Sequence, residues 1–323
     1  MPPVQPSNSK GRVLVTGAEG FTGRYLLPEL RRRGYSVIHQ AEVTCNLRDR
    51  DAVMALVKDA QPDFVIHLAA ISFVAHGSAA DMYDVNTIGT TNLLDALQTA
   101  GTRPKKLILA SSSQVYGDSS LAYLDEDSPC RPISHYACSK LAMEYMAATY
   151  FDRLPIVITR PFNYTGAGQP KHFLIPKIVD HFARGEASIE LGNLDVVRDF
   201  SDVKTVVDVY CRLLDAPVDG KVLNICSGLG RSLQSVIDDI SQALGADMRV
   251  VVRPELVRAS EIRRQVGSNE RLLKIIGPLL DIDFASTLTS MTVAAMNEAG
   301  QATSQGGESY DGQPTTKPDL SRR

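Results

Sequence analysis

The string TGAEGFTG, residues 16–23, constrains the fold of this 323-residue chain more than any other feature. It follows an apolar run at 12–16 that predicts a buried strand, and it opens a helix predicted at 21–33. A glycine-rich turn in this position is typical of dinucleotide sites, because the helix N-terminus offers unpaired N–H groups to phosphates. A glycine-rich turn without a ligand is the alternative, and the position between strand and helix favours the phosphate site.

Each glycine of the motif has its own predicted role. Gly17 permits the tight turn, and Gly20 lets the backbone approach a pyrophosphate. Gly23 lets the helix pack closely on the strand. Phe21 and Thr22 occupy the first turn of the helix, so they belong to the same predicted cofactor site.

Short apolar runs alternate with longer helical stretches through the first half of the chain. Further strands are predicted at 36–39, 63–68, 105–110 and 156–160, and further helices at 48–59, 81–99 and 136–151. Strands and helices that alternate at these lengths predict right-handed βαβ units and a parallel sheet covered on both faces. The predicted fold is therefore α/β, a Rossmann doubly wound parallel sheet.

The sequence pattern changes after residue 161, where loops rich in Gly, Pro, Asn and Asp separate shorter predicted helices and strands. We predict an NAD(P)-binding Rossmann domain at 11–161 and a smaller C-terminal α/β substrate-binding lobe at 162–299, from which some elements could return to the sheet. Residues 1–10 are polar and Pro-rich, and residues 300–323 are poor in aliphatic side chains, so both ends are predicted to be disordered.

Composition excludes several classes of function. The net charge of −3 gives no general attraction to nucleic acid or to an anionic membrane, and no apolar run approaches the length of a membrane span. The five cysteines are odd in number and lack CxxC spacing, and the histidines show no paired-ligand pattern. We therefore expect no disulfide framework, no metal site and a reducing, cytoplasmic location.

Two short motifs supply candidate catalytic residues. The segment YACSK places Tyr136 and Lys140 four residues apart on a predicted helix, so both side chains can face one site. A nearby ammonium would stabilise the phenolate and lower the tyrosine pKa from ~10 towards working pH. The segment ASSSQVYG follows the fourth strand, at the edge where such sheets bind ligands, and Ser112 can hydrogen-bond a substrate oxygen there. Its serine neighbours are alternatives that could instead satisfy backbone groups in the turn.

The type of cofactor is left open by the second strand, which ends in VIHQAEV. An acidic residue near this point would select NAD, and an arginine would favour NADP. The chain has Gln40 and Ala41 there, so the sequence does not choose between NADH and NADPH.

These motifs occur together with HLAA at 67–70, NTIGT at 86–90 and RPFN at 160–163, in the order seen in extended short-chain dehydrogenases/reductases. From about residue 11 to residue 298 the chain resembles this NAD-dependent epimerase/dehydratase family. The resemblance implies a catalytic set of Ser112, Tyr136 and Lys140 and a bound NAD(P)H. Tyr136 and Lys140 are also predicted to bind the cofactor, and Lys140 can hold its nicotinamide ribose. The further cofactor-binding residues that the resemblance implies are Asn46, Leu47, Leu68, Ala69 and Ala70. It also implies that Asn163 lies near a sugar diphosphate.

The second half narrows the resemblance. FNYTGAGQ, LGNLDVVRDFSDV and SEIRRQVGSNERL are similar to segments of GDP-6-deoxy-D-mannose reductases and of the related GDP-mannose 4,6-dehydratases. This implies that Arg198 contacts the diphosphate and that Arg258 and Glu261 lie near the nucleotide. An arginine fork suits bidentate diphosphate recognition. A surface ion pair with Asp199 or Asp202 is the alternative role for Arg198.

One position argues against dehydration. Dehydratases that resemble this chain carry a glutamate where it has Gln114, and the preceding residue is Ser113, so neither residue can act as the base. We therefore predict NAD(P)H-dependent reduction of the C4 ketone of GDP-4-keto-6-deoxy-D-mannose to GDP-D-rhamnose (GDP-6-deoxy-D-mannose). Ser112, Ser113, Gln114 and Tyr136 would line the substrate site. Hydride delivery to the opposite face would give GDP-6-deoxy-talose instead.

Three other functions remain as alternatives. An NDP-sugar 4-epimerase with retained NAD would use the same catalytic set, and a GDP-mannose 4,6-dehydratase-like enzyme would need further acid–base groups. A non-catalytic redox sensor would not need all three catalytic residues. The resemblance also implies a homodimer through the helices predicted at 81–99 and 136–151. Their apolar residues Leu93, Leu97, Leu141 and Met146 could equally face the core.

Overall fold

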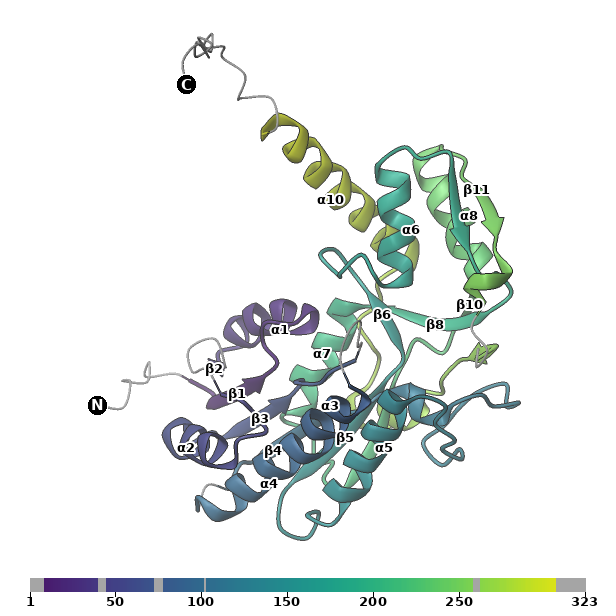
Figure 1. The fold of residues 1–323 in the computed structure, drawn as a ribbon. Helices are drawn as coiled ribbons and strands as arrows, with labels where there is room; N and C mark the ends of the chain where they lie inside the picture. Colours follow the sequence, from purple (N-terminus) through teal and green to yellow (C-terminus); the bar gives the residue numbers. More distant parts are fainter. Residues whose placement is uncertain (1–8, 40–44, 73–77, 102, 258–261, 306–323) are drawn as a thin grey trace, which may run out of the picture.

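Six parallel strands form the central sheet of the computed structural model, which describes residues 9–39, 45–72, 78–101, 103–257 and 262–305 (Figure 1). In spatial order the strands are β2 (Ser36–His39), β1 (Arg12–Thr16), β3 (Phe64–His67), β4 (Lys106–Ala110), β5 (Ile156–Pro161) and β9 (Lys221–Ile225). Each neighbouring pair is parallel, and every residue of β3, β4 and β5 is buried, as expected for a sheet covered on both faces. The predicted doubly wound α/β fold is confirmed.

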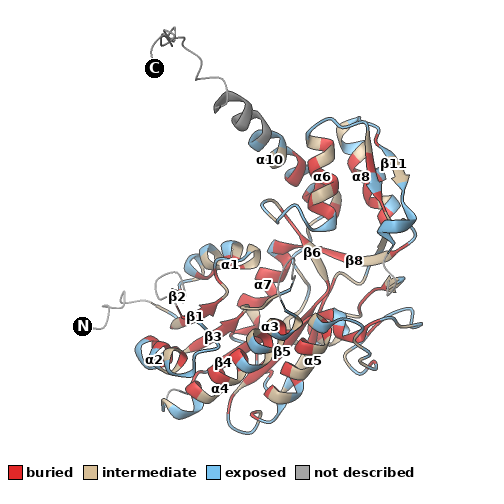
Figure 2. Cartoon of the chain, viewed as in Figure 1, coloured by how far each residue is buried: buried red, intermediate tan, exposed pale blue. Residues whose placement is uncertain are grey.

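Two layers of helices cover the sheet. The helices on one face are α1 (Phe21–Arg32), α7 (Val203–Leu213) and α9 (Glu270–Ile276), and those on the other are α2 (Arg50–Ala60), α4 (Thr90–Thr99) and α5 (His135–Ala148). In α2 the buried residues Val53, Leu56, Val57 and Ala60 recur at helical spacing, which turns one face of the helix to the sheet. Figure 2 shows the same division in α1, whereas α7 is buried on nearly all sides.

The long helix predicted after the third strand is interrupted by a π-helical segment. It consists of α3 (Ala79–Tyr83), the π-helix η1 (Asp84–Gly89) and α4. The buried Asn86 of η1 accepts from the Ile71 amide at 2.8 Å, and it donates to the Ile71 carbonyl at 3.1 Å and to Ser139 Oγ at 2.9 Å. Because these contacts reach distant parts of the chain, the apolar periodicity of the segment does not reveal the π turn.

A smaller lobe has its own core. Its strands are β6 (Asn163–Thr165), β7 (Ser188–Leu191), β8 (Val197–Asp202), β10 (Gly230–Ser232), β11 (Arg249–Val252) and β12 (Arg264–Gln265), and its helices are α6 (Leu174–Ala183), α8 (Leu233–Leu244) and α10 (Phe284–Gln305). Strands β6, β10 and β12 pair with β8, and β7 pairs with β11. Apolar residues of α6, α8 and α10 pack with β7 and β8 in one cluster, seen at the upper right of Figure 1.

The chain passes between the two parts more than once. Although α7 and β9 follow residue 162, α7 packs in the same core cluster as α1, and β9 pairs with β5 in the central sheet. The sequence left such a return open, and the boundary after residue 161 stays a prediction. Helix α10 extends beyond residue 300, where the disordered tail was predicted to begin, and its core residues Phe284, Leu288 and Met291 lie in its first turns.

The described part of the chain contains no helix that is both long enough and apolar enough to cross a membrane. Its His, Cys, Asp and Glu side chains form no group of three or more that could hold a metal ion. No disulfide joins the five cysteines, and Cys45, Cys211 and Cys226 are buried, where they pack as small apolar side chains.

A buried histidine joins two strands of the sheet to a covering helix. His67 Nδ1 lies 2.6 Å from Thr16 Oγ1 on β1, and Nε2 lies 2.9 Å from Thr90 Oγ1 on α4. Burial, together with the smaller effect of the nearby Lys140 charge, lowers the pKa of His67 to about 3. The imidazole is therefore neutral at pH 7 and has a structural role.

This histidine should make the fold less stable in acid. An unfolded histidine has a pKa near ~6.5, so between that value and about 3 the unfolded chain binds more protons than the folded chain. We expect His67 to contribute a loss of about 2 kcal/mol in unfolding free energy between pH 7 and pH 5. Chemical denaturation should show that the difference in unfolding free energy between wild type and His67→Gln becomes smaller by this amount from pH 7 to pH 5. Parallel pH curves for the two proteins would contradict the assignment.

Candidate active site

Two adjoining cavities open at the carboxyl ends of the central strands. Their volumes are about 460 Å³ and about 630 Å³. Both are lined by residues that follow β1 and β3, namely Gly17, Gly20, Leu68, Ala70 and Ile71. Because the strand order reverses between β1 and β3, this is the switch point at which open parallel sheets bind their ligands.

The predicted cofactor residues meet around these cavities. Asn46, Leu47 and Ala69 line the smaller cavity, and Phe21 and Thr22 line the larger one. Together with the residues shared by both cavities, they make one continuous wall at the end of β1 and β3.

The glycines of the motif are required by close approaches of the backbone. Gly17 has a φ of +72°, and a Cβ there would lie 2.6 Å from the Ala69 nitrogen. A Cβ on Gly23 would lie 2.0 Å from the Ala18 carbonyl oxygen, so this glycine packs the helix on the strand and lines neither cavity. A larger residue at either position would move α1 away from the strand ends.

The N-terminus of α1 fits an anionic ligand. Its N-cap residue, Gly20, supplies no capping side chain, and the first turn contains no acidic residue. The free amides and the positive end of the helix dipole therefore face the shared wall of the cavities without a competing carboxylate. These features fit the pyrophosphate of NAD(P). Gln40 and Ala41 occupy the positions at which an acidic residue would select NAD and an arginine NADP. Both residues lie outside the described part of the chain.

The catalytic and several substrate residues predicted from the sequence share the larger cavity. Its lining includes Ser112, Ser113, Gln114, Tyr136, Lys140 and Asn163. They come from the ends of β4 and β5 and from α5, which the parallel order of the sheet brings to one edge. No Asp or Glu lines either cavity in the part of the chain that the structure describes.

Hydrogen bonds distinguish the three consecutive serines. Ser111 Oγ donates to Glu144 Oε1 at 2.5 Å, and Ser113 Oγ donates to the Gln265 carbonyl oxygen Oε1 at 3.4 Å. Ser112 Oγ accepts from the Gln114 amide at 3.2 Å, which leaves its own hydroxyl hydrogen for the cavity. Ser112 is therefore the serine best placed to act on a ligand. Ser113 also lines the cavity, but its hydroxyl is bonded to Gln265 of the smaller lobe, so its substrate role stays a prediction.

Tyr136 and Lys140 lie one turn apart on α5, as their spacing predicts. Burial raises the pKa of Tyr136 to about 12, against the opposing effect of a hydrogen bond with Ser112. Burial also lowers the pKa of Lys140 to about 8, while the nearby Glu144 charge raises it. The sequence led us to expect a lowered tyrosine pKa. This was wrong for the structure described, because desolvation of the phenolate outweighs the lowering effect of the hydrogen bond with Ser112.

The ammonium of Lys140 has a defined partner. Lys140 Nζ donates to the Ala110 carbonyl oxygen at 2.8 Å, at the end of β4 and beside the serines. At pH 7 the site therefore holds a protonated phenol, a charged ammonium and a serine hydroxyl around one cavity. Such a set can donate a proton to an oxygen that develops negative charge.

The other predicted substrate residues have different outcomes. Asn163 lines the cavity, and its Nδ2 donates to the Asp199 carbonyl at 3.3 Å. Arg198 Nη1 donates to the Val197 carbonyl at 3.0 Å, and Arg198 is not among the cavity-lining residues. Arg258 and Glu261 lie outside the described residues. The diphosphate role of Arg198 therefore stays a prediction.

Sequence reasoning missed several residues of the cavity wall. Tyr164, His172 and Phe173 follow Asn163 closely, so extending the RPFN motif by ten residues could have found them. Tyr210 comes from α7, and no local pattern connects it to the site.

Tyr164 connects the two parts of the chain at the cavity. Its hydroxyl lies 2.8 Å from Thr22 Oγ1, and its ring stacks on Phe21 with centroids 6.2 Å apart. The adjoining loop is also held, because Tyr25 donates its hydroxyl to the Ala167 carbonyl at 2.7 Å. The first turns of α1 are thereby tied to the segment that carries Asn163.

Comparisons with known proteins agree with this geometry. Residues 13–226 match the family described as "NAD dependent epimerase/dehydratase family". GDP-6-deoxy-D-talose 4-dehydrogenase of Aggregatibacter actinomycetemcomitans is 34% identical over 268 residues, which cover 82% of this chain and 91% of that protein. GDP-6-deoxy-D-mannose reductase of Pseudomonas aeruginosa is 32% identical over 296 residues, which cover 87% of this chain and 95% of that protein.

A solved structure extends the likeness to three dimensions. RMD from Pseudomonas aeruginosa complexed with NADPH matches with a TM-score of 0.82 at 29% identity, over 90% of this chain and 100% of that chain. The matched share includes most of both lobes, so the likeness is not confined to the central sheet.

The lowered pKa of Lys140 predicts a pH effect on cofactor binding. Above about pH 8 the ammonium loses its proton, and its charge-assisted hydrogen bonds weaken. We expect the affinity for NADPH, followed by cofactor fluorescence, to fall between pH 7 and pH 9. Lys140→Met should bind more weakly at pH 7 and lose this pH dependence. An identical alkaline decline in both proteins would assign the effect to another group.

Proposed function

The chain belongs to the NAD dependent epimerase/dehydratase family, and from this premise we propose that it reduces the C4 ketone of GDP-4-keto-6-deoxy-D-mannose with NAD(P)H. Membership confirms the predicted family and NAD(P) as the cofactor of a nucleotide-sugar-modifying enzyme. The observation that carries the proposal is a cavity lined by Ser112, Tyr136 and Lys140 and by no carboxylate among the described residues. Ketone reduction needs one proton donor and no separate base.

The proposed mechanism assigns each side chain one task. The cofactor, held by the glycine turn and by Leu68, Ala69 and Ala70, supplies the hydride when it is bound. Tyr136 donates its phenolic proton to the oxygen that develops negative charge at C4. Ser112 donates a hydrogen bond to the same oxygen, and the Lys140 ammonium supports the charge left on the tyrosine.

The proposed GDP-sugar substrate draws on two supports. Both relatives compared above carry the names of GDP-6-deoxyhexose enzymes, and the named sugars, talose and mannose, differ in configuration at C4. The segments with Asn163 and Arg198, together with Arg258 and Glu261, are those whose likeness to GDP-sugar enzymes implied diphosphate and nucleotide contacts. We infer that the ketone at C4 is the reacting group in this chain too.

The lining of the cavity argues against dehydration. Removal of a C5 proton and elimination of water need extra acid–base groups, and Gln114 cannot supply them. Gln114 lines the cavity at the position where the sequence comparison expected a glutamate in dehydratases. The chemistry available from these side chains therefore favours reduction over dehydration.

Turnover with a GDP-4-keto-6-deoxy sugar tests the proposal. Purified protein given GDP-4-keto-6-deoxy-D-mannose should consume NADPH or NADH in equal amount to the GDP-6-deoxyhexose formed. NMR of the product should show GDP-D-rhamnose, and GDP-6-deoxy-D-talose would revise the face of hydride delivery. Tyr136→Phe should lower kcat about 10²–10⁴-fold while NADPH binding persists. Turnover without net cofactor consumption would replace the reductase with an epimerase.

We also propose a homodimer through the α3, η1, α4 and α5 surface, in a reducing cytoplasmic compartment. Leu93 and Leu97 are fully buried in the core, so they do not form the interface that the sequence left open for them. The exposed apolar side chains there are Ile88 and Tyr145, at 51% and 69%. Sedimentation should show a dimer for wild type and a monomer for Tyr145→Glu. A monomeric wild type would reject this interface.

A further inference from the structure

A buried ion pair lies behind the catalytic face of α5. Glu144 follows Lys140 by four residues and is only 5% exposed, and Arg160 at the end of β5 is 6% exposed. Arg160 Nη2 donates to Glu144 Oε2 at 2.6 Å, and Nε donates to Oε1 at 3.0 Å. Buried charges require this kind of paired, bidentate contact, so the pair holds α5 and β5 in a fixed relation.

The carboxylate of this pair also holds the strand that carries the catalytic serine. Glu144 Oε1 accepts the Ser111 hydroxyl at 2.5 Å, and Ser111 directly precedes Ser112. The Ser111 amide in turn donates to the Thr159 carbonyl on β5 at 2.7 Å. One carboxylate therefore connects the catalytic helix to the residue before Ser112.

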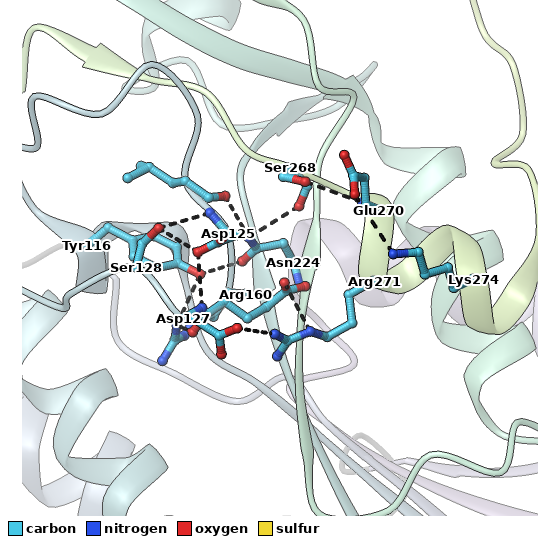
Figure 3. A network of polar contacts seen from close by, with 12 residues as sticks. Tyr116, Asp125, Asp127, Ser128, Arg160, Asn224, Ser268, Glu270, Arg271 and Lys274 are labelled. Atoms are coloured by element: carbon cyan, nitrogen blue, oxygen red, sulfur yellow. Dashed lines mark hydrogen bonds and ion pairs between the residues drawn. The ribbon is translucent and has the colours of Figure 1, made fainter.

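The guanidinium of the pair holds the other end of the same segment. Arg160 Nη1 donates to the Tyr116 hydroxyl at 3.0 Å, and Tyr116 donates to Asn224 Oδ1 at 2.7 Å. Tyr116 closes the 3₁₀ turn whose N-cap is Ser112. Figure 3 shows Tyr116, Arg160 and Asn224 within one network of polar contacts. The segment from Ser111 to Tyr116 is thus fixed on both sides of Ser112.

Resting on the reductase mechanism above, we propose that Glu144 is a positioning residue that fixes Ser112 against Tyr136 and Lys140. It occupies the same face of α5 as those two residues, at successive intervals of four. Glu144 itself does not line the cavity, so it acts through Arg160 and through two residues that do line it, Ser111 and Lys140.

The charge of Glu144 gives this role a measurable signature. Burial lowers the pKa of Lys140, and the Glu144 carboxylate is the charge that raises it again. The titratable groups around Glu144 and Arg160 are Tyr136 and Lys140 on α5, His67 on β3, Tyr116 after β4 and Cys130 in the loop before α5. His67 is neutral at pH 7 and burial raises the Cys130 thiol pKa, so Glu144 is the anion in this group that balances Lys140 and Arg160.

The test compares two buried glutamates of one network. The Glu126 side chain is 2% exposed, accepts the Asn224 amide at 2.8 Å and pairs with Arg271, and the contacts described for it do not reach Ser111. We would follow the titration of Lys140 by NMR of ¹³Cε-labelled lysine, with its signal assigned from Lys140→Met. Glu144→Gln should move the Lys140 midpoint to lower pH, whereas Glu126→Gln should leave it at the wild-type value. Glu144→Asp, which keeps the charge, should leave the Lys140 midpoint close to the wild-type value.

A second variant tests the contact with the serine segment. Ser111→Ala should lower kcat about tenfold with KM unchanged, because Ser112 loses one of its two anchors. A wild-type kcat in Ser111→Ala, or a Lys140 midpoint that is the same in both glutamine variants, would overturn the proposal. The NMR titration needs no substrate, so it remains decisive if the reductase activity is absent. If Glu144→Gln does not fold, Ser111→Ala carries the test alone.

Discussion

The parallel direction of the six central strands is the constraint on which the rest of the site depends. Parallel strands place all their carboxyl ends at one edge, so residues distant in sequence meet there without any attraction between them. Gly17 after β1, Ala69 after β3, Ser112 after β4 and Asn163 after β5 come together in this way. Single residues then complete the site. Gly17, for example, has no Cβ and so lets the turn after β1 lie against Ala69 after β3.

Burial shifts the pKa values of the two catalytic residues of α5 in opposite directions, upward for Tyr136 and downward for Lys140. It opposes the charged form of each, so the phenol of Tyr136 keeps its proton more firmly and the ammonium of Lys140 keeps its proton less firmly. At neutral pH the pair remains phenol and ammonium, which is the state that can give up a proton to an alkoxide. A dry cavity also strengthens the hydrogen bonds that form when charge develops.

Sequence patterns predicted the elements that depend on neighbouring residues. Alternating strands and helices, the glycine turn, and the Tyr136–Lys140 spacing all have local causes and were read correctly as structure. The π turn at Asn86, the bonding partners of Ser111 and Ser113 and the position of Tyr210 on α7 depend on contacts across the fold. No spacing along the chain records such contacts. The predicted pKa of Tyr136 failed for the same reason, because desolvation is a property of the assembled cavity.

The repeated passage of the chain between the two lobes limits how such an enzyme can be recombined. Strand β6 enters the smaller lobe, α7 and β9 return to the sheet, and β10 leaves again. A chimera with a single crossover after residue 161 would therefore replace α7 and α9, two of the three helices of one layer, and the edge strand β9 along with the substrate wall. Grafting another specificity onto this scaffold calls for at least three separate inserts, with residues 203–225 and helix α9 kept from the host.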